Sequence, residues 1–60
     1  MKKFILLHDC DNDGKPIILN TELIDSIEES PEGGSYIDAT LGKTLSVKET
    51  VEEIYTMLNN

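Results

Sequence analysis

Cysteine is nearly absent from this sequence of 60 residues, and its single thiol, Cys10, excludes an intramolecular disulfide. Cys10 lies between Asp9 and Asp11, whose negative charges disfavour the thiolate, so we expect no reactive nucleophile there. A chain this short buries only about 60% of the surface that its unfolded form exposes. Because no disulfide can reinforce so thin a core, a metal or a partner subunit is the remaining source of extra stability.

Basic residues are also scarce. Five of them stand against 12 acidic residues, which gives a net charge of -7 at pH 7. Phosphate backbones and anionic lipids repel such a chain, so we expect no nucleic-acid partner. The surplus carboxylates keep a small domain soluble, and they also offer a surface to a basic protein partner.

Long hydrophobic runs are missing. The apolar run Phe4 to Leu7 ends at His8-Asp9, well short of the roughly 7 to 15 apolar residues of an export signal. It is shorter still than the roughly 20 apolar residues that span a membrane. We therefore expect a cytoplasmic protein with no membrane insertion.

Residues suited to catalysis are not found together. His8 is the only histidine, and no serine has a histidine or lysine at a spacing typical of a nucleophile and its base. The carboxylates of Glu28-Glu29 and Glu52-Glu53 are sequence neighbours, which diverge on a strand or a helix and cannot act as a paired acid and base. We expect a protein that is not an enzyme and that needs no cofactor.

The pattern Asp9-x-Asp11-x-Asp13-Gly14 resembles the first half of a calcium-binding loop, in which alternate carboxylates surround the ion. The second half departs from that pattern, because Asn20 stands where a bidentate Glu is expected and the flanks predict strands. Two interpretations follow: an acidic hairpin tip, or a calcium site made by Asp9, Asp11 and Asp13. His8 beside this cluster is interpreted as a surface residue at a strand end, with a transition-metal site as the alternative.

Apolar residues alternate in a pattern that predicts five short strands, each bounded by turn residues. Pro16 lacks a donor N–H and belongs at the start or the free edge of its strand. Asn20-Thr21-Glu22 is expected to interrupt the strand ladder in an Asx-type turn, and Leu41-Gly42 to form a tight reversal. The predicted strands cover residues 3–8, 16–19, 23–29, 35–40 and 43–48.

The last part of the chain predicts one amphipathic helix. Val51, Ile54, Tyr55 and Leu58 recur at helical spacing, directly after the period-two alternation of the last strand. Thr50-Val51-Glu52-Glu53 fits a capping box; Ser46 to Glu49 fits the same pattern, but it overlaps the strand. The sequence therefore predicts one α+β domain over residues 1–60: an antiparallel five-stranded meander sheet with a C-terminal helix packed on one face.

The first two strands are apolar on both faces, and one helix cannot cover both sides of a five-stranded sheet. We therefore expect the uncovered face to form a homo-oligomer interface. The residues expected to contribute to this interface are Phe4, Leu6, Ile18, Ile24, Tyr36 and Met57.

Two segments, Ile18 to Pro31 and Gly42 to Ile54, are together similar to the FlbD family of small flagellar and swarming-motility proteins. The family pattern is approximately LN-x-[DE]-LI-x-x-IE-x-x-P, then a β segment and NGK-x-x-VKES-x-EEV. The likeness extends from Ile17 to Leu58 in the same order and spacing. The chain departs from the family in its longer first hairpin loop and in Leu41, which replaces the Asn of the family's N-G turn.

The resemblance implies a non-enzymatic factor that supports flagellar motor power or assembly, with a flagellar motor or export component as its partner. It transfers no catalytic residue. Two other functions are left open: a small calcium-binding hairpin domain, and a structural subunit of phage or mobile-element origin without a motility role.

Overall fold

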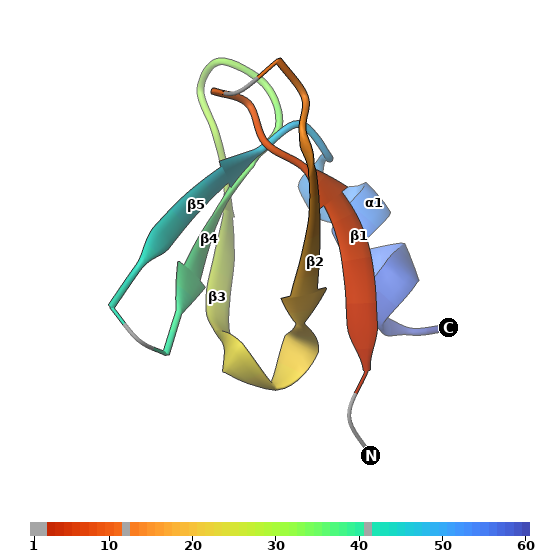
Figure 1. Cartoon of the computed structure of the whole chain (residues 1–60). Coiled ribbons are helices and arrows are strands. Elements are labelled where there is room, and N and C mark those ends of the chain that lie inside the picture. Colours follow the sequence, from red (N-terminus) through yellow and green to blue (C-terminus); the bar gives the residue numbers. More distant parts are fainter. Residues whose placement is uncertain (1–2, 12, 41) are drawn as a thin grey trace.

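The computed structural model describes residues 3–11, 13–40 and 42–60. The described chain forms five strands, a short 3-10 helix and one α-helix (Figure 1), which confirms the predicted α+β class. The elements are β1 (Phe4–His8), β2 (Pro16–Asn20), η1 (Thr21–Leu23), β3 (Ile24–Glu29), β4 (Ser35–Ala39), β5 (Thr44–Val47) and α1 (Val51–Leu58).

The five strands follow the predicted antiparallel order, but they divide into two sheets. One sheet pairs β1 with β2, and the other has the order β3-β4-β5. The division falls at the predicted Asx turn, where the Asn20 side chain accepts a hydrogen bond from the Glu22 N–H at 3.0 Å and starts η1. The chain therefore leaves the β1–β2 ladder before β3 begins, and β3 cannot pair with β2.

The two sheets meet again at their other end, where β1 and β5 converge (Figure 1). An isolated antiparallel bridge joins Asp9 to Val47. On either side of it, the Cys10 N–H donates to the Ser46 carbonyl at 3.0 Å, and the Lys48 N–H donates to the His8 carbonyl at 2.8 Å. The two sheets therefore pack against one core from two sides, and this bridge joins them.

The core draws apolar side chains from both sheets and from α1. Its buried members are Ile5, Leu7, Leu19, Ile37, Val47 and Ile54. Ile27 of β3 and Leu45 of β5 pack against this cluster and are partly buried. Because β1 and β2 contribute Ile5, Leu7 and Leu19 to the core, the inner face of their hairpin is covered and only its outer face is left open.

Both ends of α1 are held by specific contacts. Thr50 caps the helix as predicted: its hydroxyl accepts from the Glu53 N–H at 3.1 Å, and the Glu53 carboxylate accepts from the Thr50 N–H at 2.9 Å. At the other end, the Lys3 ammonium donates to the carbonyls of Met57 and Asn60. A cation at this end complements the helix dipole and ties α1 to the start of β1.

Pro16 begins β2, which is a free edge, as the sequence predicts. The predicted reversal at Leu41-Gly42 involves Leu41, which lies outside the described residues.

Gly34 provides a test of the packing between the β3–β4 turn and the end of β5. A Cβ added at Gly34 would lie 2.2 Å from the Val47 carbonyl oxygen, whereas one at Gly33 meets nothing within 4 Å. Both residues have positive φ, so alanine at either should cost about 1 kcal/mol in backbone strain. We expect Gly34→Ala to lower the free energy of unfolding by at least about 2 kcal/mol more than Gly33→Ala, because the backbone of β5 must shift. Chemical denaturation of the two variants measures this difference, and equal losses would contradict the close approach.

Candidate interaction surface

The outer face of the β1–β2 hairpin carries exposed apolar side chains. Phe4, Leu6 and Ile18 are 59%, 51% and 72% exposed, and Leu6 lies directly opposite Ile18 in the strand register. Their neighbours Ile5, Leu7 and Leu19 point into the core, as period-two alternation requires. We call Phe4, Leu6 and Ile18 the hairpin face.

The outer face of the other sheet is polar except for Tyr36, which is 38% exposed. In the strand register, Asp38 lies between Ser26 of β3 and Thr44 of β5. The Asp38 carboxylate accepts hydrogen bonds from the hydroxyls of both residues, each at 3.0 Å. Exposed sheet faces are normally of this polar kind. Since the same chain builds one polar and one apolar outer face, the hairpin face is not a requirement of the fold.

The six residues predicted for an interface do not all lie together. Phe4, Leu6 and Ile18 share the hairpin face, and Tyr36 lies opposite Ser46 in the three-stranded sheet and is 38% exposed. Ile24 and Met57 are partly buried and pack against the core. An interface role for these residues stays a prediction.

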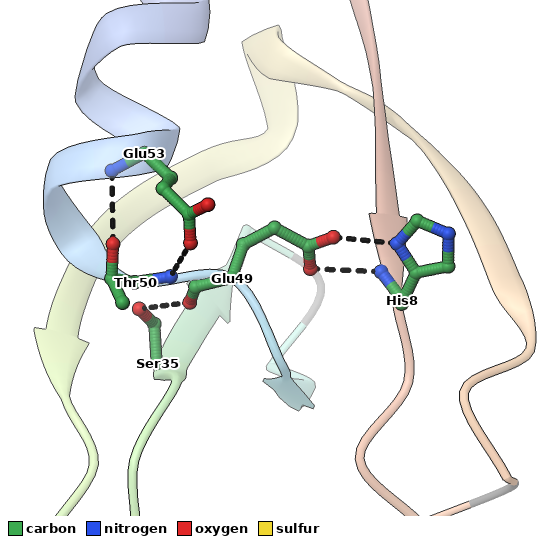
Figure 2. Close-up of polar contacts among 5 residues, drawn as sticks. All are labelled: His8, Ser35, Glu49, Thr50 and Glu53. Carbon is green, nitrogen blue, oxygen red and sulfur yellow. Dashed lines mark hydrogen bonds and ion pairs between the residues drawn. The ribbon is translucent and has the colours of Figure 1, made fainter.

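His8 ends β1 and contacts Glu49, which immediately precedes the helix cap (Figure 2). One Glu49 carboxylate oxygen accepts from the His8 backbone N–H at 2.9 Å. The other lies 2.6 Å from His8 Nδ1. The Glu49 side chain is 14% exposed and that of His8 is 44% exposed. Both oxygens of one carboxylate are therefore used to attach the end of β1 to the start of α1.

Burial alone would raise the pKa of the Glu49 carboxyl. The hydrogen bonds from the His8 side chain and backbone, together with the Glu49 backbone N–H and the charge of His8, outweigh burial and lower this pKa. Glu49 is therefore held as a carboxylate in the folded protein.

Ser35 holds the same segment from the opposite side. Its buried hydroxyl donates to the Glu49 carbonyl at 2.8 Å, as Figure 2 shows. Sequence reasoning missed Glu49 and Ser35, and it treated His8 only as a surface residue or a metal ligand. The one signal available for Glu49 was its position between the last strand and the helix cap, which does not identify its partners.

The acidic loop after β1 is partly organised by its own backbone, since the Asp9 side chain accepts from the Asp11 N–H at 2.8 Å. The Lys48 ammonium lies beside this loop: a Cβ built at Gly14 would be 3.0 Å from Lys48 Nζ. Among the described residues, no group of three or more His, Cys, Asp or Glu side chains is placed to hold a metal ion. Asn12 of this loop is outside the described residues, and calcium binding by Asp9, Asp11 and Asp13 stays a prediction.

Within residues 3–11, 13–40 and 42–60, no pocket is found. The same residues contain no helix with the length and apolar character needed to cross a membrane.

A family model described as FlbD, flagellar and swarming motility proteins, matches residues 5–59. The match covers β1 from Ile5 onward and all of β2 and α1. It also includes His8 and Glu49, which contact each other. Curated proteins and solved structures give no match to this chain.

The lowered pKa of Glu49 predicts a specific dependence of stability on pH. A group whose pKa is lower in the folded state stabilises the fold above its unfolded pKa, about 4.3 for Glu, and loses this effect as the pH falls through the folded value. We expect Glu49→Gln to lower the free energy of unfolding by about 1 to 3 kcal/mol at pH 7, because charge-assisted hydrogen bonds are lost. The difference from the native protein should shrink as the pH falls below about 4.3.

Urea denaturation across pH 3 to 7 measures this difference, with the exposed residue Glu52 providing the matched control Glu52→Gln. A difference between native and Glu49→Gln proteins that is constant over this range would contradict the account of Glu49.

Proposed function

The chain belongs to the FlbD family of flagellar and swarming motility proteins, and from this premise we propose that it is a cytoplasmic, non-enzymatic protein that acts by binding other proteins. In this proposal it needs no cofactor. It self-associates through the hairpin face and presents its acidic surface to a basic segment of a flagellar motor or export component.

The observation that carries the proposal is the contrast between the two outer sheet faces. Phe4, Leu6 and Ile18 are exposed on one sheet, while hydroxyls and a carboxylate hydrogen-bond to one another on the other. Full burial of one large apolar side chain is favourable by about 1.5 to 3 kcal/mol. Covering the hairpin face with another protein surface would therefore supply stability that a 60-residue core lacks.

Charge supports the second part of the proposal. A net charge of -7 attracts a basic partner over long range and raises its rate of association. The ammonium of Lys48 beside the acidic loop supports an interpretation in which that loop needs no metal ion. No observation favours a calcium-binding role or a phage structural subunit over binding of a motility protein.

The proposal is tested by placing one positive charge on the hairpin face. We expect the native protein at micromolar concentration to have a light-scattering mass greater than that of one chain, and Ile18→Lys to have the mass of one chain. The reason is that the ammonium of the variant would have to be buried without a partner. Thr44→Lys is the matched control, because Thr44 is exposed and lies on the outer face of the other sheet.

The same variants test the role in motility. In source cells that lack the native protein, Thr44→Lys should restore swarming and Ile18→Lys should not. A native mass equal to one chain would contradict self-association, and full swarming with Ile18→Lys would contradict a functional role for the hairpin face.

A further inference from the structure

The free edge of β2 exposes backbone hydrogen-bonding groups. At the two ends of the β1–β2 ladder, the Thr21 N–H donates to the Lys3 carbonyl and the Asp9 N–H donates to the Lys15 carbonyl, each at 2.9 Å. Hydrogen-bonded pairs alternate along an antiparallel ladder. Counting from either end, Ile17 and Leu19 direct their backbone groups toward β1. The N–H and C=O of Ile18 and the N–H of Asn20 are therefore directed away from β1.

Charge distinguishes this edge from the edge formed by β3 in the other sheet. β3 is the outer strand of its sheet and carries Asp25, Glu28 and Glu29, all exposed. Acidic residues on an edge strand oppose pairing with another chain. β2 has no charged residue, and at its centre stands Ile18, which at 72% is the most exposed of the large apolar side chains among the described residues. The protection found on β3 is therefore missing from β2.

Resting on the self-association proposed above, we propose that the occupant of this edge is β2 of a second copy, with Ile18 as the residue of the hairpin face that lies between the two copies. The two β2 strands pair antiparallel across a twofold axis at Ile18, and they form a four-stranded sheet with the order β1-β2-β2-β1. Such pairing is self-complementary, so one edge satisfies both copies.

A second copy fits this edge because of charge and register. Two chains that each carry a net charge of -7 repel one another, and this repulsion is weakest when they meet through a surface without charged residues. Neither strand of the hairpin contains Asp, Glu, Lys or Arg. Pairing centred on Ile18 places Asn20 of each copy opposite Pro16 of the other. The Asn20 N–H of each copy then donates to the Pro16 carbonyl of the other copy. Neither of these two hydrogen bonds requires the backbone N–H that Pro16 lacks.

The paired sheet would also enlarge the hairpin face. Ile18 of one copy lies beside Ile18 of the other on the outer side of the sheet, with Leu6 and Phe4 of each copy following outward. The two hairpin faces thereby become one continuous apolar surface.

Disulfide cross-linking tests the arrangement. In a background of Cys10→Ser, which removes the single native thiol, we compare Ile18→Cys with Leu6→Cys. Hydrogen-bonded residues opposite one another have Cα atoms about 5.5 Å apart, within the range of about 4.4 to 6.8 Å that a disulfide accepts. In the proposed dimer the two Leu6 residues are separated by three strand spacings, about 14 Å, which is too far.

We expect more than nine-tenths of Ile18→Cys chains to form a covalent dimer under mild oxidation, and Leu6→Cys chains to remain largely uncrosslinked. Cross-linking of Leu6→Cys to the same extent, or of neither variant while the native mass exceeds one chain, would overturn edge pairing but leave self-association standing. A native mass of one chain at micromolar concentration would overturn both proposals.

Discussion

The five-residue segment Ser46 to Thr50 holds the rest of the structure together. The Ser46 carbonyl accepts from the Cys10 N–H just after β1, and the Lys48 N–H donates to the His8 carbonyl. The Glu49 carboxylate accepts two hydrogen bonds from His8. The Glu49 carbonyl accepts from Ser35, and Thr50 caps α1. One short segment therefore attaches both sheets to the helix. In a chain with so little apolar burial, these polar contacts decide how the elements are placed.

The position of the hairpin follows from this junction. Since β1 is fixed to the end of β5 at Asp9 and Val47, the side chains of Ile5 and Leu7 enter the shared core. Alternation along the strand then places Phe4 and Leu6 on the outside, next to Ile18 of β2. The contacts that complete the fold thus also present the apolar surface through which we propose that this motility protein associates.

Local chemistry allowed the sequence to predict most of the elements. Asn20 and the pair Thr50 and Glu53 act on backbone groups only two or three residues away, so the break after β2 and the start of α1 could be inferred. The division into two sheets and the contact of His8 with Glu49 could not. That contact joins residues 41 positions apart, and no sequence pattern specifies which of 12 acidic residues His8 will meet. Leu6, which was predicted for the uncovered face, is exposed, but no pattern in the sequence indicated that Ile24 and Met57, predicted for the same interface, would pack against the core.

Native-state hydrogen exchange tests most directly the claim that the junction unites both sheets. The amides of Cys10 and Lys48 cross between the sheets, whereas the amide of the fully buried Ile37 lies in the central strand of the three-stranded sheet. If the junction unites the molecule, all three amides exchange only through global unfolding, with the same opening free energy. A distinctly lower opening free energy for Cys10 and Lys48 than for Ile37 would show that the hairpin detaches on its own, and would contradict the account.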